Sequence, residues 1–291
     1  MLMYDEPLYR PPSEASSLIL QATIGCSHNK CRFCYMYRGK SFRTKPWEDL
    51  KAEIEESALL WPGTRRIFLA DGDAFVMSTG KLERILGYLS LSFPNLQRVT
   101  AYATPQNLVS KSTEEMGRLR SKKLSILYYG VETGDPELLD TIEKGVTPDE
   151  IAEGCRRAHE TGLKLSVTVI LGLAGKGGSL RHARATAELL NRINPRYLSA
   201  LSLMLGPYED LYKEYMGSGF EFNSAMDDLL ELKEIIGALE TDRCIFRSNH
   251  ASNYLPLRGT LLGDREKLLA EIDRAIERPG AYLRSEWMRG L

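Results

Sequence analysis

Residues 162–172 read Gly-Leu-Lys-Leu-Ser-Val-Thr-Val-Ile-Leu-Gly and carry the clearest strand signal in the chain. Every odd position from 165 to 171 holds leucine or valine, and Ser166 and Thr168 stand between them. Because side chains alternate between the two faces of a strand, one face is apolar and the other carries the hydroxyl groups. In a barrel of strands and helices, the outer face of each strand meets the helices. We therefore expect Ser166 and Thr168 on the inner face, where they suit a polar ligand.

The alternation of strands and helices continues on both sides of this segment. Strands are expected at residues 18–24, 66–70, 98–102, 124–129, 163–171 and 197–205. Helices are expected at residues 47–60, 81–91, 113–120, 136–142, 148–160 and 180–192. Repeated strand–helix units imply a parallel sheet with right-handed crossovers. A closed barrel has eight units, and two of them are not found here. The sequence thus predicts an α/β fold, a partial (β/α)6 TIM-like barrel with a small C-terminal extension.

Three parts are expected along the chain. Residues 1–17 form an N-terminal lead-in, residues 18–205 form the partial barrel, and residues 206–291 form a helical extension that closes the barrel. The extension is expected to hold two helices and a short apolar segment, at residues 226–239, 264–276 and 244–246.

The composition is that of an ordinary globular protein, with 43% hydrophobic and 26% charged residues among 291. The formal net charge is −1. The chain therefore has no overall field that attracts nucleic acid or an anionic membrane, and neither is an expected partner. No stretch approaches the roughly 20 apolar residues that cross a bilayer, and residues 1–17 are too polar for a secretory signal. We expect a cytoplasmic protein.

Three of the five cysteines, Cys26, Cys31 and Cys34, lie within nine residues, directly after the first expected strand. An odd total with one tight cluster favours a metal site over a disulfide framework. Cubane iron–sulfur clusters normally take four thiolates. Three thiolates leave one iron open for a substrate or cofactor, as in open catalytic metal sites. The alternative is a structural zinc site in which His28 supplies the fourth ligand of a non-catalytic binding protein.

The cysteine loop resembles the signature of the radical S-adenosylmethionine (radical SAM) superfamily. That signature has three cysteines after the first barrel strand and an aromatic residue before the last one, as Phe33 stands before Cys34. This chain has four residues between its first two cysteines, and the family most often has three. The resemblance implies that Cys26, Cys31 and Cys34 hold a [4Fe–4S] cluster whose fourth iron binds S-adenosylmethionine. It also implies cofactor contacts from Phe33 and Tyr35.

Two further motifs follow expected strands. Residues 70–74 read Ala-Asp-Gly-Asp-Ala and occupy the place of the family's Gly-Gly-Glu-Pro, so Gly72 and Asp73 are expected to meet the amino group of the cofactor. An Asp-Gly turn without a ligand is the alternative. Residues 130–134 read Gly-Val-Glu-Thr-Gly, close to the family's Gly-Val-Glu-Ser-Gly. The resemblance places Glu132 beside the methionine or ribose part of the cofactor, whereas a helix cap is the alternative.

The strand at residues 163–171 also matches a family motif, Gly-x-Ile-x-Gly, in which the isoleucine packs on the adenine. Ile170 holds that position, and Thr168 replaces the first glycine. The resemblance therefore adds Ser166, Thr168 and Ile170 to the expected cofactor contacts. Ordinary core packing is the alternative for Ile170.

Membership of the family implies a reaction and a partner. A reduced cluster passes one electron to the sulfonium, and the resulting 5′-deoxyadenosyl radical takes hydrogen from the substrate. An external reductant of the flavodoxin or ferredoxin type is implied. We expect a small anionic substrate. Modification of tRNA is the alternative within the family, and the lack of a basic excess weighs against it.

Residues 243–254 pack hydrogen-bonding side chains between apolar ones, which is unusual for a solvent-facing loop. One hypothesis is that this segment covers the barrel mouth and that Arg247, Asn249 and Asn253 bind substrate, with His250 as a catalytic residue. Arginines favour a carboxylate or phosphate ligand. The alternative is a buried, hydrogen-bonded plug.

Four residues outside these motifs have more limited expectations. Cys244 could donate a hydrogen atom to a product radical, or it could be a small buried core residue. Cys155 falls within an expected helix and is predicted to lie in the core. His159 and His182 also fall within expected helices and are predicted to lie on the surface.

Overall fold

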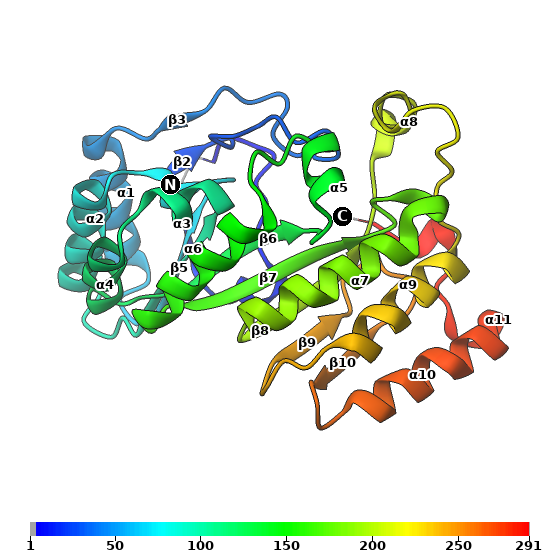
Figure 1. The fold of residues 1–291 in the computed structure, drawn as a ribbon. Coiled ribbons are helices and arrows are strands. Elements are labelled where there is room, and N and C mark those ends of the chain that lie inside the picture. The colour runs from blue at the N-terminus through cyan, green and yellow to red at the C-terminus, as the bar shows by residue number, and fades with distance from the viewer. Residues whose placement is uncertain (1–3, 291) are drawn as a thin grey trace. The chain divides into compact units, whose positions relative to one another are not determined.

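The structure, a computed structural model, describes residues 4–290. Its main sheet has eight strands in the order β1-β4-β5-β6-β7-β8-β9-β10 (Figure 1). Their bounds are β1 (Leu18–Gln21), β4 (Arg66–Ala70), β5 (Arg98–Ala103), β6 (Leu124–Glu132), β7 (Lys164–Leu171), β8 (Tyr197–Ser202), β9 (Ile245–Ser248) and β10 (Leu257–Thr260). The pairs β1–β4, β4–β5, β5–β6, β7–β8 and β8–β9 are parallel, and β9 and β10 are antiparallel. Within residues 4–290 the sheet does not close, which confirms the predicted α/β fold with a partial barrel.

The chain divides into two compact units. Unit 1 comprises Met1–Asn29, Met36–Tyr129 and Glu153–Leu165. Unit 2 comprises Lys30–Tyr35, Gly130–Ala152 and Ser166–Leu291. The boundaries predicted at residues 17 and 205 stay a prediction.

Unit 1 contains a parallel sheet covered by helices. The helices are α1 (Trp47–Leu60), α2 (Thr79–Ser92), α3 (Pro105–Ser110), α4 (Thr113–Ser121) and the larger part of α6 (Pro148–Glu160). Leu20, Leu69 and Ala101 stand side by side on β1, β4 and β5 and are completely buried. Leu50 of α1 and Leu86 of α2 are buried as well. Removal of this apolar surface from water is the main stabilising contribution.

The N-terminal lead-in of unit 1 contacts the sheet by hydrogen bonds. The Asp5 N–H donates to Gln21 Oε1 at the end of β1, at 2.8 Å. Glu14 is completely buried and accepts a hydrogen bond of 2.5 Å from the hydroxyl of Tyr128 on β6. Glu14 also contacts Arg98, 3.3 Å away at the start of β5, and accepts a hydrogen bond from the hydroxyl of Ser17. These bonds fix both ends of the lead-in.

Unit 2 contains β8, β9, β10, most of β7 and several helices. The helices are α5 (Pro136–Thr141), α7 (Gly175–Ile193), α8 (Glu209–Met216), α9 (Ala225–Ala238), α10 (Arg265–Glu277) and α11 (Pro279–Tyr282). Helix α9 lies between α7 and α10 (Figure 1). Along β7 the leucines and valines are buried, and Ser166, Thr168 and Ile170 are partly exposed, as their alternation predicts. No helix among residues 4–290 is long and apolar enough to span a membrane.

The structure differs from the sequence-based expectations in local detail. The strand expected at 18–24 divides into β1 and β2 (Thr23–Ile24), because β2 leaves the sheet to pair with β3 (Arg43–Thr44). The prediction that His182 lies on the surface is wrong. Its ring is completely buried, since it lies on the face of α7 that packs inward. Cys155 is buried in the core, as predicted.

Candidate functional site

The start of the cysteine loop is fixed within unit 1. Gly25, directly before Cys26, has a φ of +71°, a backbone conformation that favours glycine. Its N–H donates to Asp71 Oδ2 at 3.0 Å. Asp71 is completely buried, and its charge is compensated by Lys40 Nζ at 3.1 Å. Because an unpaired buried charge is strongly destabilising, this pair holds the loop at the end of β4.

Gly72 occupies a position with no space for a side chain. A Cβ placed there would lie 2.5 Å from Cε2 of Tyr37. Tyr37 is itself buried and meets Tyr9 edge to face, with 5.7 Å between the ring centroids. The backbone at Gly72 therefore passes directly against an aromatic ring, as a glycine-dependent motif requires.

Asp73 is a buried acid with incomplete hydrogen bonding. Its Oδ2 accepts hydrogen bonds from the hydroxyl of Ser27, from Asn107 Nδ2 at 3.3 Å and from Thr104 Oγ1 at 3.4 Å. Its Oδ1 is buried and has no hydrogen-bond partner within residues 4–290. Burial raises the pKa of Asp73 to about 6. A free acceptor in this setting suits a cationic donor.

The rest of the cysteine loop belongs to unit 2. The Arg32 N–H donates to the carbonyl of Ile142 at 3.0 Å, and the guanidinium of Arg32 pairs with Glu143 at 2.7 Å. These contacts attach the loop to the end of α5. Cys31 and Cys34 are joined by a backbone hydrogen bond of 3.1 Å.

The three thiols are each partly exposed. Cys26 is five residues from Cys31 along the chain, so their Cα atoms are at most about 18 Å apart. No three His, Cys, Asp or Glu side chains within residues 4–290 are placed to hold a metal ion.

Phe33 and Ile170 come together on one apolar cluster of unit 2. The buried members of this cluster are Leu138, Ile142, Leu173, Leu205 and Tyr212. Both residues pack against it and stay partly exposed. Tyr35 stacks on Tyr208, with 5.8 Å between the ring centroids and 24° between the planes. The loop thus presents apolar and aromatic surface, which suits a planar ring.

Glu132 forms a nearly buried ion pair that the sequence did not indicate. Its Oε1 lies 2.8 Å from Lys144 Nζ, and the two side chains are only 10% and 8% exposed. Lys144 Nζ also lies 5.9 Å from the centroid of the Phe33 ring. Gly130 leaves the necessary space, since a Cβ there would be 2.0 Å from Glu132 Oε1. The only sequence signal for Lys144 was its place beside Gly145, after a helix.

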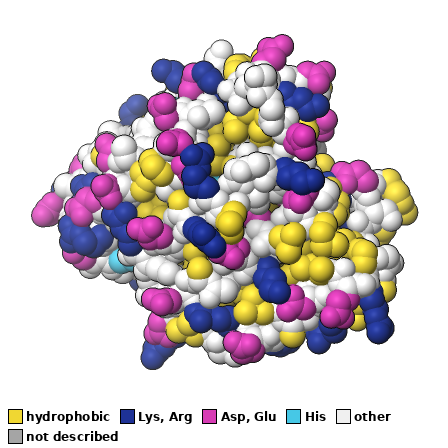
Figure 2. Space-filling model, turned by 45° about the vertical axis from the view of Figure 1, so that its right-hand side comes forward, with side chains coloured by type: hydrophobic (Ala, Val, Ile, Leu, Met, Phe, Trp, Pro, Cys, Tyr) yellow, Lys and Arg dark blue, Asp and Glu magenta, His cyan; other side chains and the backbone are white. Residues whose placement is uncertain are grey.

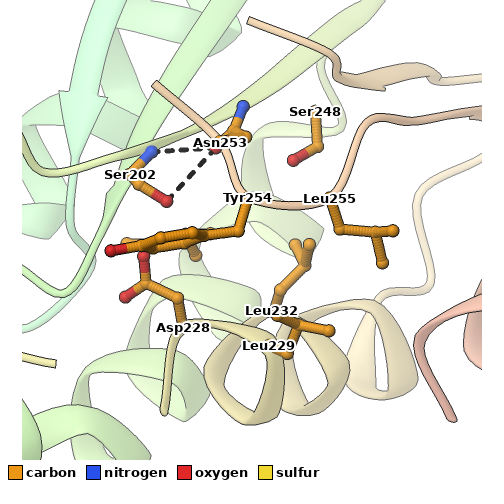
Figure 3. Close-up of a pocket in the computed structure, with 9 residues that line it drawn as sticks. Ser202, Asp228, Leu229, Leu232, Ser248, Asn253, Tyr254 and Leu255 are labelled. Carbon is orange, nitrogen blue, oxygen red and sulfur yellow. Dashed lines mark hydrogen bonds between the residues drawn. The ribbon is translucent and has the colours of Figure 1, made fainter. Parts of the chain in front are cut away.

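The segment predicted to bind substrate is bound to β8 through Asn253. Asn253 is buried, its Oδ1 accepts the Ser202 N–H at 2.9 Å, and its Nδ2 donates to the Ala200 carbonyl at 2.9 Å. Asn253 and Ser202 line a cavity (Figure 3), whose volume is about 10 Å³. That volume accommodates about one water molecule. The contacts of Asn253 therefore favour the alternative in which residues 243–254 form a buried, hydrogen-bonded plug.

Of the other predicted substrate residues, His250 contacts Asn253, whose N–H donates to the His250 carbonyl at 3.1 Å. Arg247 and Asn249 are exposed, and Arg247 Nη1 donates to the carbonyl of Phe246. His250 Nδ1 accepts the Ser252 N–H at 3.1 Å, which is a local turn contact. Burial, with a smaller effect of Arg284, lowers the pKa of His250.

Cys244 is completely buried directly before β9. The first residue of β9, Ile245, is in register with Tyr197, the first residue of β8. Cys244 is therefore at the amino ends of the parallel strands, and catalytic residues of such folds come from the carboxyl ends. Burial raises the pKa of its thiol to about 12. This position favours Cys244 as a buried core residue over a hydrogen donor.

Comparison with known proteins identifies the family to which the chain is similar. The sequence model of the radical SAM superfamily matches residues 20–190. The heme chaperone HemW of Bacillus subtilis is 22% identical over 152 residues, which are 52% of this chain and 40% of HemW. The chain matches only 35–40% of the length of its curated relatives.

Two solved structures have a similar fold. Methylornithine synthase (PylB) has a TM-score of 0.57 at 14% identity, over 88% of this chain and 68% of PylB. Native anSMEcpe with bound AdoMet has a TM-score of 0.58 at 13% identity, over 76% of this chain and 58% of that chain. At these identities the likeness concerns the fold alone.

Proposed function

Because the chain belongs to the radical SAM superfamily, we propose that Cys26, Cys31 and Cys34 hold its [4Fe–4S] cluster and that the fourth iron binds S-adenosylmethionine. The protein is a radical SAM enzyme, and its cofactors are the cluster and S-adenosylmethionine. Three thiolates are a suitable donor set for such a cluster and leave one iron open. When bound and reduced, the cluster supplies the electron that cleaves S-adenosylmethionine into methionine and a 5′-deoxyadenosyl radical, which abstracts hydrogen from the substrate.

The observation that carries the residue assignment is the free acceptor Oδ1 of Asp73. Asp73 also bonds Ser27, the residue that follows Cys26. A carboxylate at this place can accept the amino group of S-adenosylmethionine, and Gly72 lets the backbone approach. A zinc site completed by His28 gives no role to that acceptor.

The remaining contacts fall to unit 2. Glu132 accepts hydrogen bonds from the ribose or the methionine part, and Lys144 orients its carboxylate. Phe33 and Ile170 exclude water from the adenine, because both present apolar surface on the same cluster. Ser166, Thr168 and Tyr35 supply further contacts to the cofactor.

The substrate in this proposal is a small anionic molecule, and the reductant is a flavodoxin or ferredoxin in the cytoplasm. Radical SAM chemistry needs an external electron source. Modification of tRNA is less favoured. The net charge is −1, and basic and acidic side chains are interspersed on the face in Figure 2. Arg247, Asn249 and His250 remain candidates for substrate contact, and Cys244 is the weaker candidate for hydrogen donation.

Anaerobic reconstitution tests the proposal. Wild-type protein should become brown, bind about four irons per chain, and form 5′-deoxyadenosine from S-adenosylmethionine and dithionite. A variant with alanine at Cys26, Cys31 and Cys34 should lose both the iron and the product, and the control Cys155→Ala should keep them. Chromatography and iron analysis measure the two quantities. Colourless wild-type protein with bound zinc would show that the assignment is wrong.

A further inference from the structure

Glu132 sits in a strained turn. Its φ is +66°, in the left-handed region that side-chain-bearing residues rarely adopt. The Thr133 N–H donates to the carbonyl of Val131 at 2.8 Å and closes a three-residue γ-turn around Glu132. A γ-turn with positive φ is rare and strained. Such a conformation persists only where the surrounding contacts determine it, and these contacts can be identified.

Helix α7 provides them from behind the turn. His182 Nδ1 lies 2.9 Å from Thr133 Oγ1, and the Gly134 N–H donates to Thr186 Oγ1 at 3.0 Å. Between these contacts the backbones touch, since a Cβ on Gly134 would lie 2.2 Å from the carbonyl oxygen of Ala185. The three α7 residues are spaced at i, i+3 and i+4 and so share one face of the helix. The turn is held at two consecutive residues.

The other side of the His182 ring faces a buried acid of α9. Nε2 lies 3.4 Å from Glu231 Oε1 of α9, and both side chains are completely buried. Glu231 accepts hydrogen bonds from the Gly172 N–H, the Ser179 hydroxyl and Asn223 Nδ2. Burial raises the pKa of Glu231 to about 7. Above that pH its carboxylate can only accept, so Nε2 should carry the proton and Nδ1 should accept.

Thr133 completes this arrangement. Its hydroxyl oxygen already accepts the Asp135 N–H at 3.0 Å. Its single proton is therefore available for Nδ1 of His182. Burial lowers the pKa of His182 to about 4, so the ring is neutral near pH 7. A neutral ring can accept at Nδ1, and a charged ring cannot.

We propose that His182 is a positioning residue: its neutral ring accepts the Thr133 hydroxyl and, together with Thr186, fixes the strained turn that aims Glu132 at the cofactor. This inference rests on the proposed function, because Glu132 is assigned to S-adenosylmethionine there. The residues of α7 touch no cofactor themselves. Their effect reaches the cofactor through the backbone at residues 131–134.

The protonation state can be measured on the full chain without any cofactor. Imidazole ¹⁵N NMR between pH 8 and 9, where Glu231 is ionised, should show His182 with a protonated Nε2 and an unprotonated Nδ1. The chain has four histidines, and His182→Gln identifies the signal. A proton on Nδ1, or titration of the ring near neutral pH, would overturn the proposal.

The positioning role is tested with Thr133 variants of the reconstituted enzyme. Thr133→Val removes the hydroxyl at nearly constant volume and should weaken S-adenosylmethionine binding about tenfold. Thr133→Ser keeps the hydroxyl and should bind within about twofold of wild type. Binding is followed by the change in the electron paramagnetic resonance spectrum of the reduced cluster, and iron content should not change.

Thr241→Val is the matched control, because Thr241 is a buried threonine of unit 2, three residues before Cys244. It should bind S-adenosylmethionine like wild type. Wild-type affinity in Thr133→Val would overturn the positioning role. Loaded wild-type protein that binds no S-adenosylmethionine would instead overturn the proposed function and the role toward the cofactor, while the NMR result would still decide the protonation of His182.

Discussion

At the scale of single residues, the pair between Glu132 and Lys144 shows what a motif can and cannot indicate. The Gly-Val-Glu-Thr-Gly motif identified Glu132 from the sequence. Its partner, Lys144, was not predictable, because Lys144 lies in an irregular turn with positive φ at the residues on either side of it, Glu143 and Gly145. Similarly, Asp73 was a motif position, but its hydrogen bonds from Asn107 and Thr104 depend on the chain after β5.

This ion pair supports a prediction for stability. Lys144→Met should lower the free energy of unfolding by about 3 kcal/mol, because it leaves the Glu132 carboxylate nearly buried without its counter-charge. Adding Glu132→Gln should recover part of that loss. Denaturant titration measures the effect. The exposed pair of Arg192 and Asp149 is the control, and Arg192→Met should change stability by less than about 1 kcal/mol. Equal losses in the two single variants would contradict the burial argument.

At the scale of elements, long periodic segments were predictable and short ones were not. The expected bounds of α1, β4 and α6 agree with the structure, since each carries a full apolar pattern. By contrast, β3 has only two residues, and β10 pairs with β9 by a contact that no local pattern indicates. The main feature of the candidate site that the sequence did not predict is also a contact between elements. It is the pair of hydrogen bonds that join α7 to Thr133 and Gly134.

The segment after β9 gives a prediction at this scale. Asn253→Ala should lower the free energy of unfolding by about 1–3 kcal/mol, because it leaves the Ser202 N–H and the Ala200 carbonyl without partners. Cleavage of S-adenosylmethionine by the folded variant should stay at the wild-type rate. Asn249→Ala, at an exposed position of the same segment, should leave stability unchanged. A stable Asn253→Ala protein would count against the plug.

At the scale of the whole molecule, the sequence predicted the family and its cofactors, and the substrate remains a proposal. The cysteine loop and the strand-end motifs are local patterns that recur throughout the family. Substrate contacts differ among members of a fold. The chain also matches only 35–40% of the length of its curated relatives.

The stability of the molecule should depend on pH through Glu231. Burial raises the pKa of Glu231 from 4.5 to about 7. The unfolded chain therefore releases this proton at lower pH than the folded protein does. The stabilising contribution is complete below pH 4.5 and is lost as the pH rises to about 7. Relative to Glu231→Gln, wild type should lose about 3 kcal/mol over this range and change little above it.

Urea unfolding at a series of pH values measures this difference. Glu234→Gln changes a partly exposed acid of the same helix and should give a curve parallel to wild type. Parallel curves for Glu231→Gln and wild type would show that Glu231 ionises in the folded protein as it does in water.

The contacts of the N-terminal lead-in with the sheet limit which positions of unit 1 can mutate without affecting its folding. Asp5 hydrogen-bonds Gln21 at the end of β1, and the buried Glu14 contacts Arg98 at the start of β5 and Tyr128 in the middle of β6. A mutation at these strand positions therefore affects the folding of unit 1 more directly than it affects ligand binding. New specificity in unit 1 has to arise in the loops that follow the strands, which can vary while the sheet stays constant.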